Sequence, residues 1–161
     1  NKAMQAGSPD QVRALFDRLL QQYPTSGLLW YSYAQFEYRL NNVPELEEIF
    51  AAALKNVLDL RLWRLYLQHV RRVNIPVVTS AAQPASDAAE QEQVIIKAYE
   101  FAVGMIGQDV YAASVWLEYS EYLRGLGQPA GEWERQTRID QIRRVYQRAV
   151  SIPLDGIEHL W

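Results

Sequence analysis

The chain has 161 residues, of which 49% are hydrophobic and 22% are charged, the composition of one ordinary globular domain. Its formal net charge of −3 at pH 7 lacks the strong basic excess of a dedicated nucleic-acid-binding domain. The absence of cysteine excludes disulfides and thiolate sites, and no apolar stretch approaches the length of about 18 residues that predicts a membrane span.

Three helices are predicted in the first third of the chain. Ser8 is a candidate N-cap and Pro9 is tolerated in a first turn, so a helix should begin there and end at Pro24, which cannot continue it. Apolar residues at helical spacing predict two further helices over about 29–42 and 44–57. Because very few residues join these two helices, we expect them to pack as an antiparallel hairpin.

The next third contains a break in the helical pattern. Asp59 is a candidate N-cap for a helix whose apolar positions continue to Val70. The segment 74–89 is rich in Pro, Ser and Ala and has no long apolar period, so we expect a mobile loop there. Helical spacing resumes at about Glu90 and ends at Gly107.

Two helices are expected in the last third, over about 115–123 and 133–150, separated by a Gly-rich and Pro-containing stretch. A further helix is expected to begin after Pro153. Because the chain begins at Asn1 and ends at Trp161, where another tryptophan motif would open, we expect a fragment of a longer array.

A Trp-x-x-Tyr motif recurs in three of the predicted helices, which we term A helices. On a helix, positions i and i+3 share one face, so each motif places two aromatic rings side by side. The pairs are Trp30 with Tyr33, Trp63 with Tyr66, and Trp116 with Tyr119. This recurrence indicates a repeat protein.

The alternate helices, which we term B helices, each carry an aromatic residue followed by small or apolar residues at +3 and +4. These aromatic residues are Phe16, Phe50, Tyr99 and Tyr146. Each lies 13 to 17 residues before the next motif tryptophan, whereas the distance from a tryptophan to the next B-helix aromatic varies from 20 to 36 residues. Insertions therefore fall in the loops from A to B helices, where a stacked array tolerates them.

The predicted fold is all-α, an α-solenoid (superhelix) of stacked antiparallel helical hairpins. We expect a single array over 1–161, divided into a partial unit at 1–24, units at 25–58, 59–107 and 108–153, and a truncated unit at 154–161. The residues predicted to pack one hairpin against the next are Trp30, Tyr33, Phe50, Trp63, Tyr66, Tyr99, Trp116, Tyr119 and Tyr146.

Two of these helices resemble a known repeat family. Trp30, Tyr33, Phe36 and Glu37 form a Trp-x-x-Tyr-x-x-Phe-Glu pattern, and Arg143, Tyr146, Arg148 and Ala149 form Arg-x-x-Tyr-x-Arg-Ala. Both patterns resemble HAT (half-a-TPR) repeats, which occur in RNA-processing complexes. The segments 57–63, 97–107, 115–119 and 142–150 further resemble the HAT domains of the scaffold subunits of cleavage stimulation factor, which act in pre-mRNA cleavage and polyadenylation.

This resemblance implies a nuclear scaffold that binds other protein subunits of an RNA-processing complex. It implies no cofactor and no enzymatic activity, and homodimerisation only through parts that this chain lacks. Two alternatives remain open at this point. One is a HAT scaffold of a splicing or ribosomal RNA-processing complex, and the other is a helical repeat that binds RNA directly.

Arginines on the last full helix are the candidate partner-binding residues: Arg135, Arg138, Arg143, Arg144 and Arg148. A second group precedes the expected loop: Arg61, Arg64, Arg71 and Arg72. Such a run is most often a solvated helix face with i, i+4 ion pairs, here Arg144 with Asp140. The functional interpretation is a basic patch that binds an acidic protein surface or RNA phosphates.

Other polar residues are interpreted structurally. Glu37 lies on the apolar stripe of its helix, where a carboxylate needs a partner, and Arg13 or Arg18 could supply one. His69 and His159 have no ligand-like spacing, so no metal site is predicted. The chain also lacks a Gly-rich phosphate loop, a nucleophile elbow and zinc-ligand spacing, which argues against an enzyme.

Overall fold

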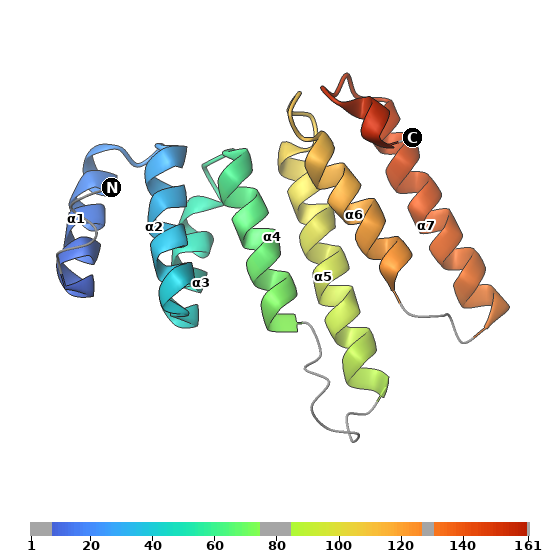
Figure 1. Ribbon diagram of the computed structural model, residues 1–161, viewed down its shortest axis with the longest axis horizontal. Helices are drawn as coiled ribbons and strands as arrows, with labels where there is room; N and C mark the ends of the chain where they lie inside the picture. The colour runs from blue at the N-terminus through green and yellow to red at the C-terminus, as the bar shows by residue number, and fades with distance from the viewer. Residues whose placement is uncertain (1–7, 75–84, 127–130, 161) are drawn as a thin grey trace. The chain divides into compact units, whose positions relative to one another are not determined.

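The computed structural model describes residues 8–74, 85–126 and 131–160, and within these ranges it contains helices and no strand (Figure 1). The all-α fold predicted from the sequence is thereby confirmed. The helices are α1 (Pro9–Gln22), α2 (Gly27–Leu40), α3 (Val43–Ala53), α4 (Leu60–Asn74), α5 (Ala85–Ile106), α6 (Ala113–Gly125), α7 (Glu132–Val150) and the short 3₁₀ helix η2 (Ile157–Leu160). The chain packs as two compact units, 1–69 and 70–161, and their boundary falls within α4.

Local signals explain where several helices begin and end. Ser8 occupies the N-cap of α1, but only its backbone carbonyl is used there, accepting from the N–H groups of Gln11 and Val12. Asp59 caps α4 through its side chain, whose Oδ1 accepts from Arg61 N at 2.9 Å and Leu62 N at 3.4 Å. The capping role predicted for Asp59 is therefore confirmed, whereas the Ser8 side chain makes no capping hydrogen bond.

In the first unit, α2 and α3 pack as the expected antiparallel hairpin and α1 packs against α2 (Figure 1). The aromatic rings of successive helices meet where the repeat pattern places them. Phe16 of α1 stacks on Tyr33 of α2 with ring centroids 4.8 Å apart, and Phe50 of α3 meets Tyr66 of α4 edge-on at 5.4 Å. Each B-helix aromatic thus contacts the tyrosine of the following A helix, which ties one hairpin to the next.

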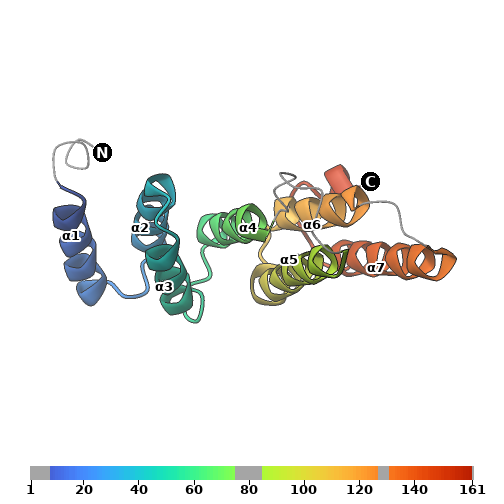
Figure 2. The same cartoon turned by 90° about the horizontal axis from the view of Figure 1, so that it is seen from below.

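The second unit repeats this arrangement with α5, α6 and α7. Helix α6 packs against both neighbours and lies to one side of them, so α5 and α7 form one layer and α6 the other (Figure 2). Tyr99 of α5 stacks on Tyr119 of α6 with centroids 5.0 Å apart and ring planes within 5°. Tyr99 also stacks on Tyr122, which lies about one turn after Tyr119 on α6, with ring centroids 5.7 Å apart.

The motif tryptophans add a hydrogen bond to this packing. Each indole Nε1 donates to a backbone carbonyl. Trp30 donates to Pro24 at 2.7 Å, Trp63 donates to Val57 at 2.9 Å, and Trp116 donates to Gly107 at 3.0 Å. Each acceptor lies in the segment that follows a B helix. These indole hydrogen bonds therefore fix the connection between consecutive hairpins.

Gly107 is needed where Trp116 approaches the backbone. A Cβ atom at position 107 would lie 2.9 Å from Cζ2 of Trp116, closer than side-chain contacts allow, and nearer still to the carbonyl oxygen of Val103. Glycine therefore permits both the indole hydrogen bond and the close packing of the buried ring at this connection.

The structure corrects the bounds of the loop that was expected between the fourth and fifth helices. The loop expected over 74–89 was predicted too long, because Asn74 ends α4 and α5 begins at Ala85. The Ala-rich composition that suggested a loop also has high helix propensity, which accounts for the earlier helix start. Residues 75–84 and Trp161 lie outside the described residues. The division into repeat units stays a prediction.

Candidate protein-binding groove

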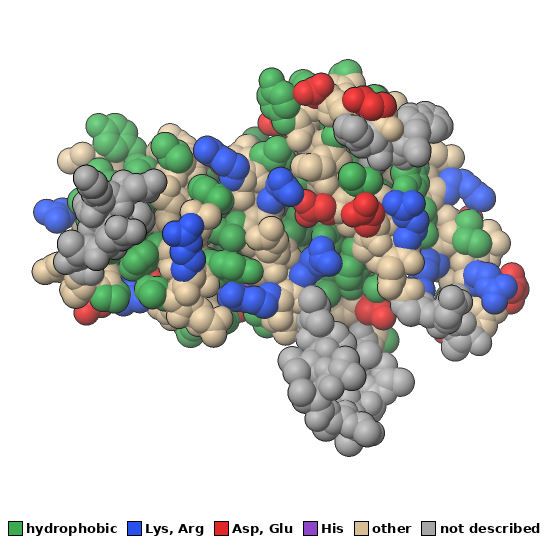
Figure 3. Space-filling model, in the orientation of Figure 1, with side chains coloured by type: hydrophobic (Ala, Val, Ile, Leu, Met, Phe, Trp, Pro, Cys, Tyr) green, Lys and Arg blue, Asp and Glu red, His purple; other side chains and the backbone are tan. Residues whose placement is uncertain are grey.

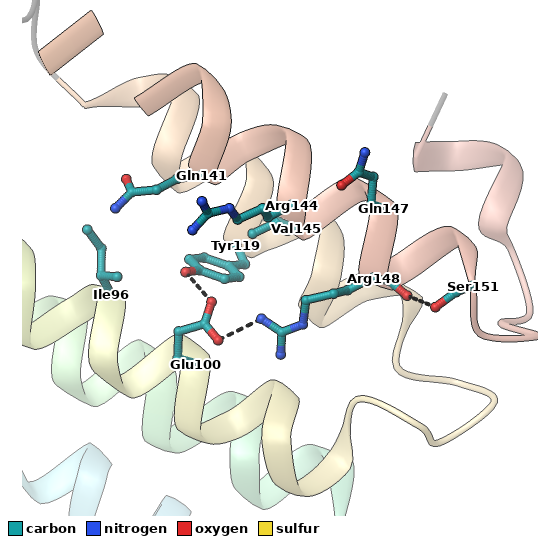
Figure 4. A pocket seen from close by; sticks show the side chains of 9 residues that line it. All are labelled: Ile96, Glu100, Tyr119, Gln141, Arg144, Val145, Gln147, Arg148 and Ser151. Carbon is teal, nitrogen blue, oxygen red and sulfur yellow. Dashed lines mark hydrogen bonds and ion pairs between the residues drawn. The ribbon is translucent and has the colours of Figure 1, made fainter. Parts of the chain in front are cut away.

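A groove of about 570 Å³ runs between α5 and α7 in the second unit (Figure 4). Ile96 and Glu100 of α5 lie on one side of it, and Tyr119 of α6 projects between the two helices (Figure 4). The α7 side is formed by Gln141, Arg144, Val145, Gln147 and Arg148, with Ser151 just beyond the helix end. Polar groups thus surround a partly apolar floor.

Glu100 holds two of the lining residues in place. Its Oε1 accepts from the Tyr119 hydroxyl at 2.7 Å, and its Oε2 accepts from NH1 of Arg148 at 2.7 Å (Figure 4). Burial of the ring, together with the hydrogen bond to Glu100, raises the pKa of Tyr119. The hydroxyl therefore stays protonated and donating at neutral pH.

Arg148 is fixed from a second direction as well. Its guanidinium lies 5.2 Å from the ring centroid of Trp116, within cation–π range. Arg148 is therefore preorganised. Glu100 and Trp116 already hold its side chain, so a ligand would not have to order it.

Arg144 lies one turn before Arg148 on the same face of α7, and Figure 4 shows it reaching over the groove. It is exposed and makes no ion pair with any described residue. Gln141 and Gln147 flank it with amide groups that can donate and accept hydrogen bonds. An uncompensated cation in a groove that is also lined by amides and by Ile96 suits a polypeptide segment that carries an acidic side chain.

The five arginines predicted to bind a partner have different surroundings in the structure. Only Arg144 and Arg148 line the groove. Arg135 pairs with Glu132 at 3.0 Å, and Arg138 donates to the Leu126 carbonyl at 3.2 Å. At 3.6 residues per turn, Arg135 projects about 180° around the helix from Arg144, which explains why spacing along the chain overstated the patch.

The prediction that Arg144 forms an ion pair with Asp140 is wrong. Asp140 Oδ1 instead accepts from Arg143 NH1 at 2.8 Å and from Gln136 Nε2 at 3.2 Å. An i, i+3 arginine satisfies this carboxylate as readily as an i, i+4 arginine, and it leaves Arg144 to the groove.

The structure places the predicted packing residues at different depths. Six of them are buried: Tyr33, Phe50, Trp63, Tyr99, Trp116 and Tyr119. Trp30, Tyr66 and Tyr146 are only partly buried. Among these three, Tyr66 still contacts Phe50 and Trp63, and Tyr146 lies 6.0 Å below the guanidinium of Arg124.

Glu37 is fully buried and forms the predicted ion pair with Arg13. Arg13 Nε donates to Oε1 at 2.8 Å and NH2 donates to Oε2 at 3.0 Å, a two-pronged contact. Asn42 Nδ2 adds a third hydrogen bond at 2.8 Å. Arg18, the other candidate partner, instead donates to the carbonyl of Ala14. The hydrogen bond to Glu37 raises the pKa of Arg13, so the guanidinium stays charged.

The histidines are placed as follows. His69 is buried at the position where the other A helices carry Phe36 and Tyr122, and its ring lies 5.7 Å from that of Phe50. Its Nε2 is 3.8 Å from Glu47 Oε1. The His159 side chain is outside the described residues. In the described part of the chain, no three His, Cys, Asp or Glu side chains are grouped to hold a metal.

Sequence reasoning missed Glu100 and Gln141 as groove residues. Glu100 lies on α5, the helix before that of Tyr119, whereas Glu45, which accepts from Tyr33 at 3.0 Å, lies on α3, the helix after that of Tyr33. Because the spacing differs, no sequence motif marks the carboxylate that holds each tyrosine.

No helix among the described residues is both long and apolar enough to span a bilayer.

Comparison with known proteins identifies relatives along the whole chain. The sequence profile of the family described as suppressor of forked protein (Suf) matches residues 1–161. The chain is 32% identical over 155 residues to the mRNA 3′-end-processing protein rna14 of Schizosaccharomyces pombe, covering 96% of this chain and 20% of that protein. It is 36% identical to rna14 of Emericella nidulans, covering 94% of this chain and 14% of that protein.

A third relative is the protein suppressor of forked of Drosophila melanogaster, 32% identical over 151 residues, covering 94% of this chain and 18% of that protein. The chain thus spans a fifth or less of the length of these three relatives.

Proposed function

This chain belongs to the suppressor of forked family, and from that membership we propose that it is a protein–protein interaction scaffold in pre-mRNA 3′-end cleavage and polyadenylation. The proposal draws on the names of two relatives, which are called mRNA 3′-end-processing proteins. These names favour this process over splicing or ribosomal RNA processing, and they support a nuclear location.

The observation that carries the scaffold role is the groove between α5 and α7. Glu100, Tyr119 and Arg148 form a fixed polar link between the two sides of the groove, and Arg144 lines the α7 side without an ion pair to a described residue. A segment of a partner subunit would place an acidic side chain against Arg144 and an apolar side chain against the partly exposed Ile96. Such a role needs binding alone and assigns no catalytic residue.

Direct RNA binding through this groove is less well supported. Single-stranded RNA is usually held by aromatic rings whose faces are open to the bases. The ring of Tyr119 is buried against that of Tyr99, and the indole of Trp116 is covered by Arg148. These rings are committed to packing, and the net charge of −3 provides little long-range attraction for phosphates.

Charge reversal at two positions of α7 tests the proposal. Arg144→Glu alters the groove, whereas Arg135→Glu makes the same charge change on the opposite face and breaks only an exposed ion pair. In an extract-based assay that cleaves a pre-mRNA substrate, we expect Arg144→Glu to lower activity several-fold and Arg135→Glu to leave it near wild type.

Equal activity of both variants would contradict the proposal. A gel shift of RNA by the wild-type chain that weakens with salt and disappears with Arg144→Glu would support the RNA-binding alternative instead.

A further inference from the structure

A second groove, of about 390 Å³, lies in the first unit between α2 and α4. Its polar lining includes Tyr31, Tyr38 and Arg39 from α2, and Arg61 and Arg64 from α4. No Asp or Glu is among its lining residues. In Figure 3 the face of this unit over α2 and α4 carries blue Lys and Arg side chains, in keeping with the composition of the groove.

The groove is preorganised by contacts among its own residues. Arg61 NH2 binds Asp59 Oδ2 at 2.6 Å, and its guanidinium lies 5.5 Å from the centroid of the Tyr31 ring. The Tyr31 hydroxyl accepts from Gln35 Nε2 at 3.0 Å. Tyr31 and Arg61 are thus held in place before any ligand arrives, which lowers the entropic cost of binding.

Arg39 provides the uncompensated charge. It is exposed, and it makes no ion pair with a described residue, whereas the charge of Arg61 is partly offset by Asp59. Leu60 and the buried Leu65 add apolar surface to the lining. The combination of cations, amides and leucines is complementary to an extended peptide in which acidic and apolar residues alternate.

We propose that the α2–α4 groove is a docking site for an acidic, extended segment of a partner protein, with Arg39 as its main charge contact. A protein segment is favoured over RNA because Arg61 covers the Tyr31 ring, which leaves that face closed to a base. The site is in a different unit from the α5–α7 groove, so it stands whether or not that groove binds a partner.

Fluorescence anisotropy with a labelled peptide tests this site. The probe is a decapeptide of alternating Glu and Val, and its control has Gln in place of Glu. We expect the 161-residue chain to bind the Glu peptide at least tenfold more tightly than the Gln peptide, with an affinity that falls as salt is raised.

Two charge reversals locate the binding. Arg39→Glu should weaken binding of the Glu peptide about tenfold, because an attractive contact becomes repulsive. Arg18→Glu is the matched control, since Arg18 is exposed on α1 and does not line the groove. Far-UV circular dichroism of both variants shows whether the fold is intact, and NMR shift changes in the wild-type chain should fall on α2 and α4.

Three results would overturn this inference: no binding of the Glu peptide at millimolar concentration, equal loss of binding in both variants, or shift changes away from α2 and α4. If an oligo(A) RNA binds more tightly than the Glu peptide, and Arg39→Glu abolishes this RNA binding, the groove would be assigned to RNA instead.

Discussion

Replacing Trp63 by alanine should destabilise the chain by about 4 kcal/mol. Trp63 is 0% exposed, and a fully buried aromatic of about 150–250 Å² contributes roughly 4–6 kcal/mol at about 25 cal/mol per Å². Measured aromatic-to-alanine losses of about 3–5 kcal/mol agree with this range. The variant also removes the indole donor to the Val57 carbonyl, which leaves a buried acceptor without its partner.

Urea unfolding followed by far-UV circular dichroism measures this loss without relying on tryptophan fluorescence. Trp133→Ala is the control, because Trp133 is 78% exposed and its removal should change the free energy of unfolding by less than about 0.5 kcal/mol. Trp63→Phe should lie between the two, since it keeps part of the ring but loses the hydrogen bond. A loss below about 1 kcal/mol for Trp63→Ala would refute the proposed packing between hairpins.

The remaining predictions concern polar and backbone contacts. Glu37→Ala should cost on the order of 3 kcal/mol in urea unfolding, because Arg13 and Asn42 lose a buried acceptor, and a neutral result would contradict that role. The hydrogen bond and charge of Arg61 lower the pKa of Asp59 below its ordinary 3.8, so the ion pair stabilises the fold above that pH and its contribution is lost as the pH falls through the lowered value. Asp59→Asn should therefore be less stable than wild type by about 0.5–1 kcal/mol at pH 7, and the gap should begin to shrink only below pH 3.8; a gap that stays constant as the pH falls further would refute this linkage. Gly107→Ala should lower the melting temperature and shift the near-UV signal of Trp116, whereas Gly104→Ala, where an added Cβ meets nothing within 4 Å, should not.

The helices and the buried aromatics were largely predictable, because they depend on local spacing. The near-constant distance from each B-helix aromatic to the next tryptophan predicted that the aromatic residues pack between hairpins, and the structure shows which rings meet: Phe16 with Tyr33 and Tyr99 with Tyr119. The place of Glu37 on the apolar stripe predicted an ion pair with Arg13 or Arg18, and the structure shows that Arg13 is the partner.

The grooves were not predictable from such patterns. Which arginines share a surface depends on their angle around α7 and on the neighbouring helix, so Arg135 and Arg144 looked equivalent in the sequence. The pairing of Glu100 with Arg148 joins residues 48 positions apart without a fixed motif. The start of α5 at Ala85 was also missed. A segment rich in alanine occurs in loops as well as in helices, so its composition did not predict the helix.

Site-specific photo-crosslinking within the assembled processing machinery tests the central claim most directly. A benzoylphenylalanine at Gln141, in the α5–α7 groove, should crosslink to one defined protein subunit, and Arg144→Glu in the same chain should reduce that crosslink several-fold. The same photo-residue at Arg135, on the opposite face of α7, should not yield it. A crosslink from position 141 to RNA alone, or equal protein crosslinks from both positions, would contradict the groove as a protein-binding site.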